Sequence, residues 1–166
     1  MSAMLANNIL QNEGERFFDF KNSLYESVFY KDVELFVSTL NRFLASIPYD
    51  DFAKSARQSI RSYKNHAHEW LYRSSLLAFF RGAGIMAFGE MHTNKGRSDI
   101  VLTNRGRTFV LEIKVAYTSE EISIKLAEAK KQMLSCNYAA SYTDTISLAL
   151  IIDDTQRQIA VSEEVK

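Results

Sequence analysis

Two carboxylic acids and a lysine are the residues in this chain whose types and spacing best suit chemistry. Asp99 ends the short run Gly96–Asp99, and the triplet Glu112, Ile113 and Lys114 follows within an apolar segment. Side chains alternate between the two faces of a strand, so Glu112 and Lys114 share one face, roughly 6.5–7 Å apart along the chain. A hairpin between the two segments would bring Asp99 near Glu112 at one edge of the sheet. Two carboxylates beside an ammonium predict a divalent-metal site suited to phosphodiester hydrolysis.

Each of these residues also has an ordinary structural role. Charged residues alternate with apolar ones in most half-exposed strands, Asp99 could cap a turn, and Lys114 could be a solvated strand lysine. Val110 and Val115, however, make the segment apolar on both faces, which indicates a buried central strand. Acids are rarely buried in such a strand without a partner or a metal. The pattern therefore favours a functional site.

Apolar periodicity predicts the elements that would position these residues. A helix is expected over His66–Arg81, with one stripe made of Ala67, Trp70, Leu71, Ser74, Leu77, Ala78 and Arg81. A second helix is expected over Ser119–Cys136, with a stripe of Ile122, Leu126, Ala129, Met133 and Cys136. Strands are expected over Ile85–Met91, Asp99–Thr103, Thr108–Val115, Ile146–Ile152 and Gln158–Val161. The resulting order, αβββαββ, predicts an α/β protein with a mixed sheet.

The N-terminal third has helical periodicity but no residues that suggest chemistry. Two helices, Gly14–Tyr30 and Asp32–Ile47, are expected to pack antiparallel and to give aromatic side chains to a core. A weaker helix is expected over Asp50–Tyr63. We therefore expect an N-terminal helical extension over residues 1–62 and a catalytic core over residues 63–166.

Composition limits the classes of protein to consider. The chain has 166 residues, 46% of them hydrophobic, with eleven Phe and eight Tyr, which excludes global disorder. Lys and Arg equal Asp and Glu at 20 each, so the basic surplus typical of a nucleic-acid-binding protein is absent. Basic residues nevertheless cluster around the candidate site in the sequence, among them Lys95, Arg97 and Lys130.

Several other kinds of site are not expected. Cys136 is the only cysteine, so no intramolecular disulfide can form, and no signal peptide or long apolar segment is evident. A cytoplasmic protein without a membrane span is expected. His66 and His68 would point about 200° apart on a helix, which does not suit one zinc ion. No glycine-rich phosphate loop occurs, so ATP hydrolysis is not expected.

The chain resembles the PD-(D/E)XK nuclease superfamily over about residues 20–160. That family has a core of one helix, a three-stranded antiparallel meander, a second helix and further strands, which is the order expected here. The resemblance rests on Glu69 in the first helix, on the loop Glu90–Asp99, on the (D/E)-x-K element Glu112–Lys114 and on Gln132 in the second helix. It narrows to a branch of bacterial proteins in which this domain follows an AAA-ATPase-like domain, because Ala45–Tyr49 and the apolar helices before it are similar to that branch.

The resemblance implies a restriction-endonuclease-like fold, a Mg²⁺ or Mn²⁺ cofactor and DNA as substrate. Asp99, Glu112 and the carbonyl of Ile113 would bind the metal, and Lys114 would lie near the attacking water. Glu69 and Gln132 would complete the catalytic site, with Glu90 close by. The implied nucleic-acid contacts are Lys95, Arg97 and Lys130. A homodimer, docking to an ATPase domain and a catalytically silent scaffolding module remain open alternatives.

Overall fold

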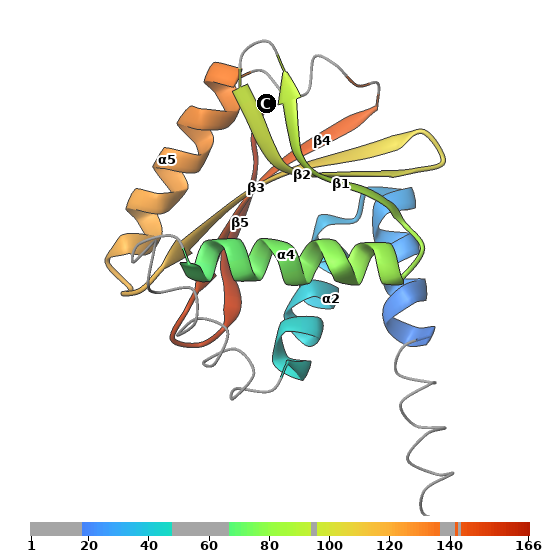
Figure 1. Cartoon of the computed structure of the whole chain (residues 1–166), viewed down its shortest axis with the longest axis horizontal. Coiled ribbons are helices and arrows are strands. Elements are labelled where there is room, and N and C mark those ends of the chain that lie inside the picture. The colour runs from blue at the N-terminus through green and yellow to red at the C-terminus, as the bar shows by residue number, and fades with distance from the viewer. Residues whose placement is uncertain (1–17, 48–66, 94–95, 137–141, 143) are drawn as a thin grey trace, which may run out of the picture.

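A computed structural model describes residues 18–47, 67–93, 96–136, 142 and 144–166 (Figure 1). Five strands form one mixed sheet in the order β1-β2-β3-β4-β5. The strands are β1 (Met86–Thr93), β2 (Gly96–Asn104), β3 (Arg107–Ala116), β4 (Thr145–Asp153) and β5 (Gln158–Glu164). The helices are one over residues 18–30, α2 (Val33–Ser46), α4 (Ala67–Gly82) and α5 (Glu121–Cys136). The expected α/β class and the αβββαββ order are confirmed.

The sheet separates two hydrophobic layers, and β3 is its central strand. β3 pairs antiparallel with β2 and parallel with β4, to which α5 connects it. Phe109 and Ile113 lie in the layer shared with α2 and α4, whereas Val110 lies in the layer shared with α5. Figure 1 shows α5 on one side of the sheet and α2 and α4 on the other. The expected alternation of β3 side chains is therefore confirmed, with Phe109 and Ile113 fully buried.

A two-residue turn sets the register between β2 and β3. Arg105 and Gly106 both have positive φ, 49° and 82°, as the tight hairpin turns that match strand twist require. Ile100 consequently pairs with Leu111. The expected hairpin is confirmed, and it brings Asp99 to the position beyond this pair, next to Glu112.

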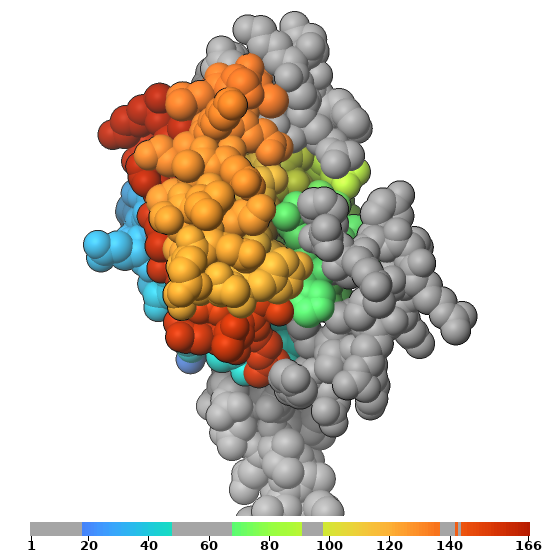
Figure 2. Space-filling view, turned by 90° about the vertical axis from the view of Figure 1, so that its left-hand side faces the viewer, coloured from blue at the N-terminus to red at the C-terminus, as the bar shows by residue number. Residues whose placement is uncertain are grey.

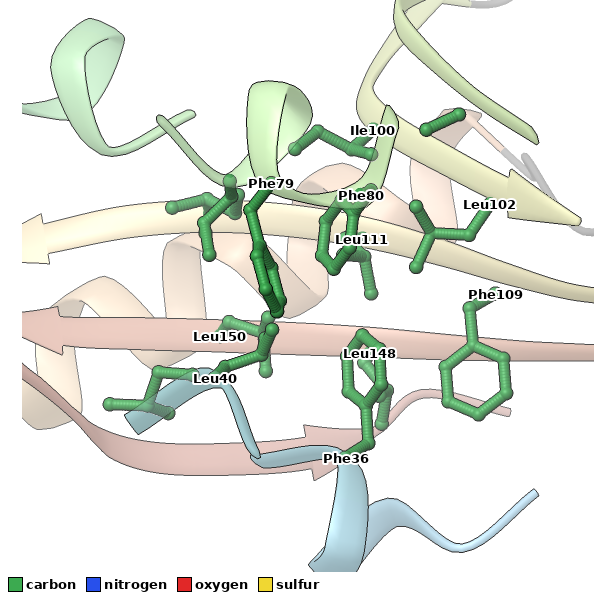
Figure 3. Close-up of a cluster of buried hydrophobic side chains, with 14 of the residues drawn as sticks. Phe36, Leu40, Phe79, Phe80, Ile100, Leu102, Phe109, Leu111, Leu148 and Leu150 are labelled. Carbon is green, nitrogen blue, oxygen red and sulfur yellow. The ribbon is translucent and has the colours of Figure 1, made fainter. Parts of the chain in front are cut away.

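The N-terminal helices contribute to the main core. Leu24 and Val28 from the first helix and Phe36 and Leu40 from α2 are fully buried in the same cluster as the sheet. The ring of Phe36 lies 4.9 Å from that of Phe109 on β3, measured between centroids (Figure 3). The expected turn near residues 30–32 and the aromatic contribution to the core are confirmed.

The predicted stripe on α4 is only partly right, because Leu71 and Leu77 pack against the core but other members of the stripe do not. Trp70 is 54% exposed, and Ala78 and Arg81 are exposed as well. The buried side chains of α4 are instead Tyr72, Leu76, Phe79 and Phe80. This helix carries apolar residues around most of its circumference, so periodicity alone did not fix which face meets the sheet.

The expected loop before Asp99 is also wrong. β2 begins at Gly96, and β1 continues to Thr93, so most of the segment 90–99 is strand and Asp99 lies inside β2. At the start of β2, the pairing with β1 continues to Thr93 and Gly96, whereas the pairing with β3 stops at Ile100. The first residues of β2 are therefore paired on one side only. Because this part of the hairpin is rich in polar residues, its sequence is typical of a loop.

Some expectations fall outside the described residues. These are the helix over residues 50–63, residues 14–17 of the first helix and the domain boundary near residue 62. Among the residues that the structure describes, no helix is both long and apolar enough to cross a membrane.

Candidate functional site

Asp99 lies where β2 loses regular pairing with both of its neighbours. In the pairing with β1, Ile100 lies opposite Gly89 and Ser98 lies opposite Met91, but Asp99 between them has no paired residue. In the pairing with β3, Ile100 is the last paired residue of β2 at this end. The Asp99 side chain takes the place of a strand partner, because Oδ2 accepts a 2.8 Å hydrogen bond from the amide of Ile113. The carboxylate is buried and held against β3 rather than directed into solvent.

Glu112 and Lys114 form an ion pair on one face of β3. Lys114 Nζ donates to Glu112 Oε1 over 2.8 Å. Glu112 is completely buried, and its second oxygen, Oε2, has no hydrogen-bond partner among the residues that the structure describes. A buried carboxylate oxygen without a donor costs about 1–3 kcal/mol or more. This oxygen is therefore free to carry the proton of a neutral carboxyl or to accept a donor or a cation.

The surroundings of Glu112 favour its protonated form. Burial, followed by the negative charge of Asp99, raises the pKa of Glu112 to about 7, and the nearby charge of Lys114 opposes the rise only in part. Burial acts to lower the pKa of Lys114, but the charge of Glu112 and the hydrogen bond between them outweigh it, so the net shift is upward. Lys114 therefore stays cationic while Glu112 titrates near neutral pH.

Glu69 is electrostatically part of the same site. It lies in the first turn of α4, and its charge contributes to raising the pKa values of Glu112, Lys114 and Tyr117. Asp99 and Glu69 thus both act on the Glu112–Lys114 pair through their charges. The structure brings together Asp99, Glu112 and Lys114 from β2 and β3 by direct contacts with β3, whereas Glu69 on α4 is linked to them by its charge alone.

Arg73 joins two of the acids from the helix side. Its Nη1 lies 3.0 Å from Asp99 Oδ1, and its Nη2 lies 2.7 Å from Glu90 Oε1. Glu90 has a backbone φ of 53°, the left-handed conformation that non-glycine residues seldom adopt. The expected proximity of Glu90 to the site is thus seen, and Arg73 makes the connection.

A second group of polar side chains anchors the first turn of α4. Asp154, in the turn after β4, accepts hydrogen bonds at Oδ1 from His68 Nδ1 at 2.8 Å and from the Tyr72 hydroxyl at 3.0 Å. Burial, then the charge of Asp154, raises the pKa of Tyr72, so its hydroxyl remains a donor. His68 and Tyr72 lie on either side of Glu69 in the sequence. Asp154 therefore fixes the part of α4 that carries Glu69.

The other residues predicted for the site make no contact with Asp99, Glu112 or Lys114 among the contacts of the described residues. Gln132 is half-buried on α5, beside the buried Met133, and its catalytic role stays a prediction. Lys130 forms an ion pair with Glu163 of β5; Figure 2 shows α5 in orange next to the C-terminal strands in red. Lys95 and the side chain of Arg97 lie outside the described residues, so these two nucleic-acid contacts also stay predictions.

The site offers the type of donor atom that a hard divalent cation takes, although its described acids do not yet form a closed ligand set. Such ions take carboxylate and carbonyl oxygens together with water, and Glu112 Oε2 is an oxygen that still lacks a partner. Within the described part of the chain, no three His, Cys, Asp or Glu side chains form a group that could hold a metal ion as they stand. Two of the carboxylates are instead engaged by Arg73 and Lys114.

A family model of the PD-(D/E)XK nuclease superfamily matches residues 67–161, which is more than half of the chain. The protein therefore belongs to the PD-(D/E)XK nuclease superfamily. The match extends from the start of α4 into β5 and includes Glu69, Asp99, Glu112 and Lys114. Comparison with curated proteins gives no match.

Three residues of the site were missed by sequence reasoning: Arg73, His68 as a partner of Asp154, and Asp154 itself. Arg73 had a usable signal, because it follows Glu69 by four residues and so lies one turn along the same face of the helix. The contact between His68 and Asp154 had none, since 86 residues separate them.

Proposed function

We propose that the protein is a metal-dependent nuclease that hydrolyses phosphodiester bonds in DNA. The observation that carries the proposal is the buried Glu112 carboxylate: Lys114 holds its Oε1, and no described residue donates a hydrogen bond to its Oε2. A site that keeps an acid buried, with one oxygen unsatisfied and its pKa raised towards neutrality, costs stability. Such a cost is typical of functional sites rather than of structural ion pairs.

In this proposal Asp99, Glu112 and the carbonyl of Ile113 hold a Mg²⁺ or Mn²⁺ ion, with Glu69 and Gln132 completing the site. When bound, the ion would lower the pKa of a coordinated water and polarise the scissile phosphate. The amide of Ile113 fixes the orientation of Asp99, and Lys114 fixes that of Glu112. Both carboxylates are thus held in place by contacts that involve β3.

Lys114 has a second role in the proposal. Its ammonium is cationic and largely shielded from water, with 17% of the side chain exposed. A fixed positive charge in such an environment stabilises negative charge that develops on the phosphate as the P–O bond forms. Lys114 would therefore both orient Glu112 and stabilise the transition state, and Lys95, Arg97 and Lys130 would contact the nucleic-acid backbone.

A panel of substrates tests this function. Supercoiled plasmid, linear duplex, single-stranded DNA and RNA are incubated with the full chain in EDTA, in Mg²⁺ and in Mn²⁺, all without ATP. We expect cleavage of DNA with either metal and none in EDTA. Cleavage that is equally fast in EDTA, or that requires ATP, would refute the proposal.

The second candidate is a catalytically silent module of the same fold that serves as an interaction or scaffolding domain. It is favoured by Asp99, because Arg73 and the amide of Ile113 already engage both of its carboxylate oxygens. The zero net charge of the chain also favours it. In that case Mg²⁺ and Mn²⁺ would not bind, and none of the substrates would be cleaved.

We also infer that the chain belongs to the bacterial branch associated with AAA-ATPase-like domains and works in the cytoplasm, as a homodimer or docked to such a domain. The resemblance of Ala45–Tyr49 and the preceding helices to that branch supports this. Light scattering of the purified chain, alone and mixed with an ATPase domain encoded beside it, tests the two assemblies. If the chain is monomeric and does not bind the ATPase domain, both proposed assemblies are refuted.

A further inference from the structure

The outer face of α5 carries a stripe of side chains that the sheet does not cover. Ile124 and Leu134 are 57% and 58% exposed, and neither belongs to the hydrophobic cluster that α5 forms with the sheet. Ile124, Ala127, Lys131 and Leu134 follow one another at intervals of three, four and three residues, so they lie on one face of the helix. Figure 2 shows the surface of α5, in orange, facing the viewer. These four residues, the outer stripe of α5, are therefore accessible to a partner.

The shape of this face suits another helix. A three–four spacing of mainly apolar residues is the pattern by which two helices pack side by side. A shallow groove follows the stripe and is lined by residues of α5 that include Ser123, Ala127, Lys131 and Leu134. Ser123 and Ala127 are small, so they leave room beside Ile124 for a larger side chain from a neighbouring helix.

The outer stripe is complementary to its own reverse. Ile124 and Leu134 each lie five residues from position 129, and Ala127 and Lys131 each lie two residues from it. A second copy related by a two-fold axis, with its α5 antiparallel, would therefore place Ile124 against Leu134 and Ala127 against Lys131. The methylenes of Lys131 can pack over the small Ala127 while the ammonium stays in water. The stripe thus fits a second copy of this chain.

The charges of α5 favour this orientation over a parallel one. Lys131 is exposed and forms no ion pair with any residue that the structure describes. Parallel packing would place Lys131 against the same lysine of the second copy, which is unfavourable. Antiparallel packing places it beside the second copy's Glu128, an acid that is half exposed and paired at the surface with Lys125. It also sets the two helix dipoles against each other in the favourable sense.

We propose that the outer stripe of α5 is the interface of a homodimer, in which two copies of α5 pack antiparallel about a two-fold axis. This inference rests on the homodimer proposed above and names the surface that forms it, and it does not depend on nuclease activity. Two helices of 16 residues make a small interface, below the roughly 1,200 Å² of total buried surface at which stable complexes begin. The dimer should therefore dissociate on dilution.

Analytical ultracentrifugation of the full chain in EDTA, over a wide range of protein concentration, tests the surface. Wild type should change from monomer to dimer as concentration rises. The double variant Ile124→Glu with Leu134→Glu should stay monomeric, because its acids would be buried at the interface. Lys131→Leu should tighten the dimer by about tenfold or more, since two buried leucines replace two lysines. Met86→Glu changes a residue on β1 that is 60% exposed; it is the matched control and should dimerise as wild type does.

Cross-linking tests the orientation of the two helices. In a background where the single cysteine, Cys136, is replaced by serine, Ile124→Cys and Leu134→Cys are prepared as separate variants and treated with a short bifunctional maleimide. Antiparallel packing predicts cross-linked dimers when the two variants are mixed and few when either is treated alone. The reason is that the two copies of position 124 would lie about 15 Å apart along the helix axis.

The outcomes separate this inference from the other proposals. A wild type that is monomeric at every concentration overturns both the inference and the homodimer proposed above. A dimer that persists in the folded Ile124→Glu and Leu134→Glu double variant, with its fold checked by circular dichroism, overturns the inference alone. If the double variant does not fold, the cross-links decide. Links between positions 124 and 134 support the inference, whereas links between like positions, or none in a dimeric sample, overturn it.

Discussion

Nζ of Lys114 lies 2.8 Å from Oε1 of Glu112, and the two side chains project from the same face of the central strand. This contact occupies one carboxylate oxygen, and the other, Oε2, is buried without a partner among the described residues. The pair therefore divides the carboxylate into an oxygen that the protein holds and an oxygen that is available to a cation.

Replacing Lys114 by Met should separate metal binding from catalysis. At a pH well above the pKa of Glu112, we expect Mn²⁺ affinity to stay close to that of wild type. Cleavage should slow by about 10²–10³, the scale for losing one preorganised electrostatic contact in the transition state. Single-turnover cleavage and calorimetry measure the two effects. Lys125→Met, which breaks an exposed pair with Glu128 on α5, is the control and should change neither.

The buried Glu112 should make the metal-free protein less stable at alkaline pH. Its pKa of about 7 in the folded state exceeds the ordinary glutamate pKa of 4.5, so the folded state binds more protons than the unfolded state between these two pH values. The contribution of Glu112 is thus fully present below about pH 4.5 and is lost as pH rises through about 7.

Glu112→Gln should remove this pH dependence. In EDTA, wild type is expected to lose stability relative to the variant between pH 4.5 and 8, by at most ~3 kcal/mol. Denaturant unfolding at several pH values gives the two profiles. If the unfolding free energies of wild type and variant change with pH in parallel, Glu112 is not desolvated as the structure indicates. In a separate measurement, adding Mg²⁺ above pH 7 should stabilise wild type more than the variant.

Asp154→Asn should loosen the first turn of α4. The variant loses the charged acceptor of the hydrogen bonds from His68 and Tyr72, so we expect a loss of about 1–2 kcal/mol in unfolding free energy. Cleavage should also fall, because Glu69 lies between the two donors. Asp144→Asn, which removes an exposed acid paired with Arg107, should leave cleavage unchanged. Equal effects of the two variants on cleavage would refute an anchoring role for Asp154.

The order of elements was accessible from the sequence because the helices and strands have distinct apolar periods. The tight turn at Arg105 and Gly106 then fixed the pairing that places Asp99 beside Glu112. Which face of α4 packs on the sheet was not accessible, since Trp70, which is exposed, and Phe80, which is buried, are both large aromatic residues. The choice depends on the partners that the sheet and α2 present.

Only those residues of the candidate site that lie close together in the sequence could be predicted to lie close together in space. Glu112 and Lys114 lie two residues apart on a strand, so their common face follows from local geometry. The pair of Arg73 with Glu90 depends on a left-handed residue within β1, for which Glu90 gives no local signal. The contact of Asp154 with His68 depends on how the turn after β4 meets α4.

Phe36→Ala should show that α2 and the sheet share one core. The Phe36 ring is fully buried and lies 6.1 Å from Phe80 and 4.9 Å from Phe109, measured between centroids. Truncation is expected to cost about 3–5 kcal/mol in a single cooperative unfolding transition. Phe18→Ala, at an exposed position, should cost less than ~0.5 kcal/mol. A second, separate transition in Phe36→Ala would indicate that the N-terminal helices are an appendage.

The most direct test of the central claim is plasmid nicking by the variant that carries both Asp99→Asn and Glu112→Gln, compared with wild type in Mg²⁺. Both substitutions keep the shape of the side chain and remove its charge, so the variant should fold, which its circular dichroism spectrum checks. We expect wild type to nick the plasmid and the double variant to show no cleavage above background. The loss of nicking activity in the double variant should be no greater than in the stronger of the two single variants, because the residues act as one unit. Nicking that survives in the folded double variant would show that Asp99 and Glu112 do not form the catalytic site.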